Sequence, residues 1–132
     1  MTLVPRYIDK ADYAELTFSV CSLVHSQEKY DRLLASFARL GFTSENSEFL
    51  AADNRHLNQF DGYSWHKALL AVARGRFVVF SHDDIELVDQ GFAELLAWTQ
   101  WLDENDPKWL LAGVAGGVWH MPRRPRPALA LR

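Results

Sequence analysis

The feature that most constrains the fold is a short apolar run that stops at two adjacent carboxylates. The run reads Arg76-Phe77-Val78-Val79-Phe80-Ser81-His82-Asp83-Asp84-Ile85. A buried strand cannot hold unpaired charges, so Asp83 and Asp84 are expected at its exposed end. In a parallel sheet that end is where ligands bind, and two carboxylates there suit a hard divalent cation that grips a diphosphate. The run therefore predicts a parallel sheet with a ligand site at its carboxyl edge.

Length and composition fit one folded domain. The 132 residues are 48% hydrophobic and include five Trp, which argues against disorder and predicts a mainly buried set of Trp side chains. Cys21 is the single cysteine, so there is no disulfide framework, and its apolar neighbours predict a buried thiol rather than a reactive one. We expect one α/β domain over residues 1–121 and an irregular tail over residues 122–132. A genuine basic tail and a shifted reading frame near Met121 both fit the Pro- and Arg-rich tail.

The charge distribution bears on partners and location. The net charge is −3, but residues 1–121 hold 10 Lys and Arg (14 minus the 4 of the tail) against 17 Asp and Glu, a balance of −7. An acidic body does not suggest a nucleic-acid partner. The N-terminus lacks the apolar segment of a signal peptide, and no apolar run approaches the roughly 20 residues of a membrane span. We expect a cytoplasmic protein, with a peripheral position at the inner face of the membrane as the alternative.

Hydrophobic periodicity predicts strands that alternate with helices. The expected elements are strands at residues 16–24, 48–52, 76–82 and 109–118, and helices at residues 27–40, 64–75 and 92–102. Ser26 is a candidate N-cap of the first helix and Gly41 a candidate C-terminal residue. This order is typical of a three-layer α/β/α fold with a mostly parallel, Rossmann-like sheet. Right-handed crossovers would bring His25, Asp53-Asn54 and Asp83-Asp84 to one edge of that sheet.

With these patterns together, the chain resembles the N-terminal, donor-binding half of a bacterial family 2 type glycosyltransferase of the GT-A fold. The matching stretches are Phe18-Ser19-Val20-Cys21-Ser22, Ala52-Asp53-Asn54, Asp61-Gly62-Tyr63, residues 68–85, and residues 102–109 with residues 113–116. The resemblance implies that this chain is truncated, and that the acceptor site and the catalytic base lie beyond it. It further implies transfer of a sugar to an acceptor hydroxyl on a glycan or a lipid-linked molecule.

The resemblance also implies roles for individual residues. Asp84 would bind Mn²⁺ or Mg²⁺ in a DXD-like motif, with Asp83 beside it as a second metal ligand or a nucleotide contact. The donor would be a nucleoside diphosphate sugar of the UDP, dTDP or GDP type. Asp53 would contact its base or ribose, and Asn54, His25 and Lys67 would complete the nucleotide site.

Other interpretations of the same residues stay open. Asp83-Asp84 and Asp53-Asn54 also fit plain turns after a strand. The chain also fits a non-catalytic α/β module that uses the Asp pair as a Mg²⁺ site, or a remnant that binds partners without binding nucleotides. In the remnant, the exposed edge of the sheet would favour self-association.

Overall fold

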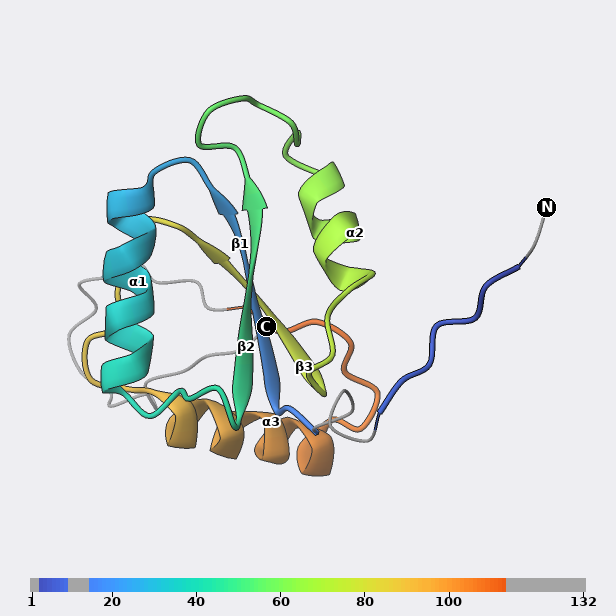
Figure 1. Ribbon diagram of the computed structural model, residues 1–132. Coiled ribbons are helices and arrows are strands. Elements are labelled where there is room, and N and C mark those ends of the chain that lie inside the picture. Colours follow the sequence, from blue (N-terminus) through green and yellow to red (C-terminus); the bar gives the residue numbers. More distant parts are fainter. Residues whose placement is uncertain (1–2, 10–14, 114–132) are drawn as a thin grey trace. The chain divides into compact units, whose positions relative to one another are not determined.

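The computed structural model describes residues 3–9 and 15–113. Strands and helices alternate along this part of the chain, as the sequence predicts (Figure 1). The elements are β1 (Phe18–Val24), α1 (Gln27–Arg39), β2 (Ser47–Asp53), α2 (Ser64–Leu70), β3 (Phe77–His82) and α3 (Phe92–Asn105). The chain divides into two compact units, Met1–Leu95 and Leu96–Arg132, and the first contains the sheet with α1 and α2.

The sheet has three parallel strands in the order β2-β1-β3. The central strand β1 is buried along almost its whole length, which suits its run of small and β-branched residues. Its Cys21 lies opposite Leu50 of β2 and Phe80 of β3. The predicted parallel α/β arrangement is therefore confirmed for the described residues.

Helix α1 covers one face of the sheet, and Figure 1 shows it on the side opposite α2. A cluster of phenylalanine rings fills this face, with centroid separations from 4.8 to 6.3 Å. Its members are Phe18, Phe37, Phe42, Phe49, Phe77 and Phe92. Several of these pairs are edge-to-face, the geometry that aromatic rings prefer.

Helix α2 covers the opposite face. Its Trp65 and Leu69 form a buried cluster with Cys21 and Ala52, and the ring of Trp65 meets Phe80 edge-to-face at 5.5 Å. The predicted burial of Cys21 is confirmed, since its side chain has no exposed surface. Burial, with a smaller effect from the Glu48 carboxylate, raises the pKa of the Cys21 thiol to about 11.

The ends of α1 follow its sequence signals. Ser26 is the N-cap, and its hydroxyl accepts a hydrogen bond from the backbone N–H of Lys29 at 3.4 Å. Gly41 follows the helix with φ of +94°, a left-handed conformation that glycine adopts without steric cost. Both predicted helix signals are confirmed.

A polar network joins the strands at the amino end of the sheet. The carboxylate of Glu48 accepts hydrogen bonds from the Ser19 hydroxyl (2.6 Å), the Arg74 backbone N–H (2.6 Å) and Arg74 Nε (3.1 Å). The backbone N–H of Gly75 in turn donates to the Ser19 hydroxyl at 2.7 Å. A Cβ at Gly75 would lie 2.4 Å from the backbone nitrogen of Ser19, so this close approach requires glycine.

Helix α2 and the expected fourth strand differ from the sequence prediction. Helix α2 ends at Leu70 rather than near residue 75. The fourth strand expected at 109–118 is not formed at residues 109–113, and the rest of it, like the tail at 122–132, lies outside the described residues. Trp65 is buried as predicted, whereas Trp101 is 52% exposed. No helix within the described ranges is long and apolar enough to span a membrane.

Candidate ligand site at the carboxyl edge of the sheet

The ends of the three strands meet at the carboxyl edge, as the crossover argument predicts. The backbone N–H of Asn54, after β2, donates to the carbonyl oxygen of Val24 at the end of β1 (2.9 Å). Asp83, after β3, reaches the backbone of His25 on the other side of β1. The residues that follow the three strands therefore lie at one edge of the sheet, although their individual roles differ.

Asp83 ties β3 to the start of α1. Its side chain is only 9% exposed, and its Oδ2 accepts hydrogen bonds from the backbone N–H groups of His25 (2.8 Å) and Ser26 (3.1 Å). A carboxylate is well suited to this place, because the amides at the start of a helix attract negative charge. Asp83 thus occupies amides that would hold a ligand phosphate in many nucleotide-binding folds.

Asp84 is the exposed member of the pair. One of the two Asp83 oxygens is already engaged, so a cation here would have Asp84 and at most Oδ1 of Asp83 as carboxylate ligands from the pair. Within residues 3–9 and 15–113, no three His, Cys, Asp or Glu side chains gather as a metal cage. This donor set does not fit a cation held by protein alone. It fits Mg²⁺ or Mn²⁺ that keeps waters and arrives with a ligand phosphate.

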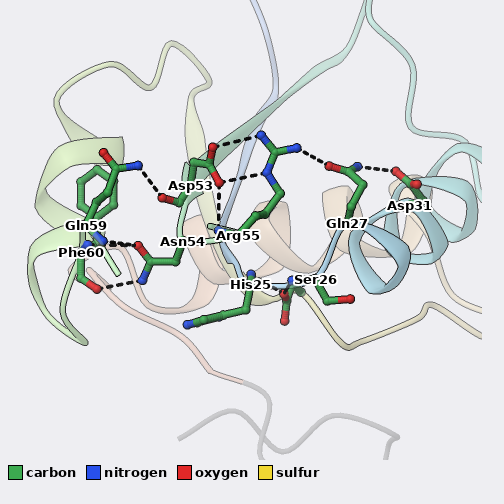
Figure 2. Close-up of polar contacts among 10 residues, drawn as sticks. His25, Ser26, Gln27, Asp31, Asp53, Asn54, Arg55, Gln59 and Phe60 are labelled. Carbon is green, nitrogen blue, oxygen red and sulfur yellow. Dashed lines mark hydrogen bonds and ion pairs between the residues drawn. The ribbon is translucent and has the colours of Figure 1, made fainter. Parts of the chain in front are cut away.

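Asp53 is held by its neighbour Arg55 (Figure 2). Arg55 donates from Nε to Oδ1 (2.9 Å), from Nη2 to Oδ2 (3.0 Å) and from its backbone N–H to Oδ1 (3.0 Å). These contacts hold the pKa of Asp53 well below its usual range. Arg55 also donates from Nη1 to Oε1 of Gln27 (2.6 Å), whose side-chain amide donates to Asp31 (2.6 Å). The network links the end of β2 to α1.

Asn54 organises the loop that follows β2. Its Oδ1 accepts hydrogen bonds from the backbone N–H groups of Gln59 (2.9 Å) and Phe60 (3.0 Å), and its Nδ2 donates to the carbonyl oxygen of Phe60 (2.9 Å). The side chain is 6% exposed. Its polar atoms are therefore largely engaged with the loop itself, as Figure 2 shows.

A pocket of about 630 Å³ opens between the end of β1 and this loop. Its lining consists of Leu23, His25, Asn54, Asn58, Gln59, Phe60, Asp61, Gly62 and Ser64. The volume lies in the range of small-molecule sites, and the lining combines an apolar part with several polar side chains. Among the predicted nucleotide contacts, His25 and Asn54 line the pocket. Asp53, Lys67 and Asp83 are not part of its lining, and Lys67 is exposed on α2.

Sequence reasoning gave no ligand role to the far wall of the pocket. Asp61 and Ser64 contact each other's backbone at the start of α2. Asp61 Oδ1 accepts from the N–H groups of Tyr63 (2.9 Å) and Ser64 (2.6 Å), while the Ser64 hydroxyl accepts from the N–H of Asp61 (3.1 Å). The run of polar residues from Asn54 to Ser64, directly after a strand, could have indicated a pocket wall. The geometry of this loop, however, cannot be predicted from the sequence.

Comparison with known proteins overturns the family expectation. No protein-family model matches the chain. A protein of Fuscovulum blasticum named "ATP synthase subunits region ORF 6" is 58% identical over 119 residues, which make up 90% of this chain and 48% of that relative. The chain thus spans about half the length of this curated relative.

The expected membership in the family 2 glycosyltransferases is therefore wrong, and with it the GT-A assignment and the sugar-transfer function that the resemblance implied. The structure offers a physical reason for the misleading match. Asp83 and Asp53, two of the residues that carried it, serve contacts within the fold. Any parallel α/β sheet can need such polar residues where its strands end.

Proposed function

We propose that this protein is a ligand-binding α/β domain that takes a nucleotide in the pocket at the carboxyl edge of its sheet. The observation that carries the proposal is the lining of that pocket, which pairs Leu23 and Phe60 with the polar side chains of His25, Asn58 and Gln59. A nucleoside has the matching chemistry, since it joins a flat apolar ring to polar edges. The carboxyl edge of a parallel sheet is also the usual place for such a ligand.

Two side chains of the lining have the freedom that a ligand contact requires. His25 and Asn58 are exposed, and neither side chain makes a hydrogen bond with the described residues. The backbone of His25 is fixed by Asp83, so its imidazole projects from a rigid base. Asn58 offers an amide with a donor and an acceptor side by side, which suits the edge of a base.

A divalent cation is part of the proposal. Asp83 joins the Asp pair to the pocket through the backbone of His25, and His25 itself lines the pocket. Asp84 would then hold Mg²⁺ or Mn²⁺ that bridges to the phosphates of the nucleotide. The cation would offset phosphate charge that the amides at the start of α1 cannot take, because Asp83 already occupies them.

Calorimetric titration tests this function. UDP, dTDP and GDP are titrated with and without Mn²⁺ into the wild type, His25→Ala, Asp84→Ala and the control Lys67→Ala. We expect His25→Ala to weaken binding under both conditions and Asp84→Ala to remove only the Mn²⁺-dependent part. Lys67→Ala should bind as the wild type does, because Lys67 does not line the pocket. Failure of the wild type to bind any of the nucleotides would contradict the proposal.

A further inference from the structure

The carboxylate of Asp61 lies in the pocket lining, and only its Oδ1 atom accepts hydrogen bonds from backbone amides of the described residues. Both backbone contacts fall on Oδ1, from Tyr63 (2.9 Å) and Ser64 (2.6 Å). These two contacts, with a further contribution from the Ser64 hydroxyl, lower the pKa of Asp61, so the group is ionised at neutral pH. The residue lines the pocket together with Gly62 and Ser64.

Other polar groups around the site are less available to a ligand. The carboxylate of Asp53 is paired with Arg55 and is not part of the pocket lining. The side-chain oxygen of Asn54 already accepts hydrogen bonds from two backbone amides of the loop. Among the residues that the structure describes, Asp61 is the one carboxylate in the lining of this pocket, and its fixed Oδ1 orients the Oδ2 atom.

We infer that Asp61 accepts a hydrogen bond from a hydroxyl group of the ligand, and that in a nucleotide this is the 2′-hydroxyl of the ribose. The inference rests on the proposed function and names a specificity-determining residue within it. An ionised carboxylate is an acceptor only, so it selects for a donor such as O–H. In α/β dinucleotide sites, an acidic side chain commonly accepts a hydrogen bond from the ribose 2′-hydroxyl. Asp61 would thus distinguish ribonucleotides from 2′-deoxyribonucleotides.

The test compares two nucleotide pairs, UDP with dUDP and GDP with dGDP, on three proteins. In the wild type we expect the ribonucleotide to bind about tenfold more tightly, the size of one hydrogen bond to a charged group. Asp61→Asn keeps an oxygen for the Tyr63 and Ser64 amides but loses the charge. It should bind the ribonucleotide as weakly as the deoxyribonucleotide and leave binding of the latter unchanged. The control Asp53→Asn should keep the tenfold preference.

A second measurement separates recognition from a purely structural role. The backbone amides of Tyr63 and Ser64 report on the Asp61 carboxylate, so their NMR signals should shift more with UDP than with dUDP. If the wild type binds both members of each pair equally, or if Asp61→Asn keeps the preference, the inference is wrong while the proposed function stands. If no nucleotide binds at all, both are wrong.

Discussion

At the scale of single residues, neighbouring carboxylates at the carboxyl edge contact different partners. Asp83 is buried against two backbone amides, whereas Asp84 is exposed. The sequence places both at the end of a strand, but adjacent residues leave a strand in different directions, and only the packing decides which of them turns inward. The contacts of Asp53 could not be predicted from the sequence either, because nothing in the sequence fixes its pairing with Arg55.

The contacts of Asp83 make it important for stability. Asp83→Ala leaves the backbone amides of His25 and Ser26 without their acceptor, and we expect a loss of about 1–3 kcal/mol in the free energy of unfolding. Asp83→Asn retains an acceptor oxygen and should lose less. Urea denaturation measures the change, with Asp84→Ala as the control, expected within about 0.5 kcal/mol of wild type because the side chain is exposed. Equal effects of the two alanine variants would contradict the assigned role of Asp83.

Glu48 should make stability depend on pH. Burial by itself would raise its pKa, but the hydrogen bonds from Ser19 and Arg74 outweigh this and lower the pKa below its ordinary value. The stabilisation is therefore complete above the unfolded pKa of about 4.3 and is lost as pH falls through the lower pKa of the folded state. Glu48→Gln cannot ionise, so the stability gap between wild type and variant should shrink from pH 7 to pH 3. Urea denaturation at both values measures it, and a constant gap would contradict the prediction.

At the scale of elements, α1 could be predicted from signals within or next to the helix, whereas the conformation of the loop after β2 could not be predicted. Ser26, Gly41 and the apolar period lie within the helix or next to it, so sequence alone reports its bounds well. The loop depends instead on where the side chain of Asn54 points. In the same way, the expected strand beyond Trp109 had apolar residues but lacks strand structure at residues 109–113, because apolar character does not determine pairing.

Asn54 is expected to hold the pocket wall in place. Asn54→Ala removes its contacts with Gln59 and Phe60 and should speed hydrogen exchange at both amides. It should also lower the free energy of unfolding by about 1–3 kcal/mol, since buried groups lose their partners. Asn58→Ala is the matched control, because Asn58 lines the same pocket without such contacts. Unchanged exchange at Gln59 and Phe60 in Asn54→Ala would show that another feature orders the loop.

At the scale of the whole molecule, the parallel α/β class followed from the alternation of elements, while the family did not. In the described part of the chain, β2 and β3 form the two edges of a three-stranded sheet. The strand order β2-β1-β3 brings three strand ends to one site, and this much could be inferred from right-handed crossovers. The ligand could not be inferred in the same way, because the shape and the polar groups of the pocket depend on the loop after β2 and on the contacts of each carboxylate.

The edge strands β2 and β3 of the described sheet lead us to expect self-association. Edge strands present unpaired backbone groups that can pair with another copy of the chain. The half-buried, apolar character of β3 adds to this tendency. We expect the apparent mass in light scattering to rise with protein concentration, and Ala51→Lys, which adds a charge at an exposed position of the edge strand β2, to reduce the rise. A monomeric mass across the concentration range, with a cooperative melt, would contradict the prediction.

The most direct test of nucleotide binding at the carboxyl edge is a two-dimensional amide NMR titration of the wild type with UDP and GDP in the presence of Mg²⁺. We expect saturable shifts concentrated at His25, Asn58, Gln59, Phe60 and Gly62, and little change at the amino end around Ser19 and Glu48. Spectra unchanged at millimolar nucleotide, or shifts centred on the amino end of the sheet, would contradict nucleotide binding in this pocket.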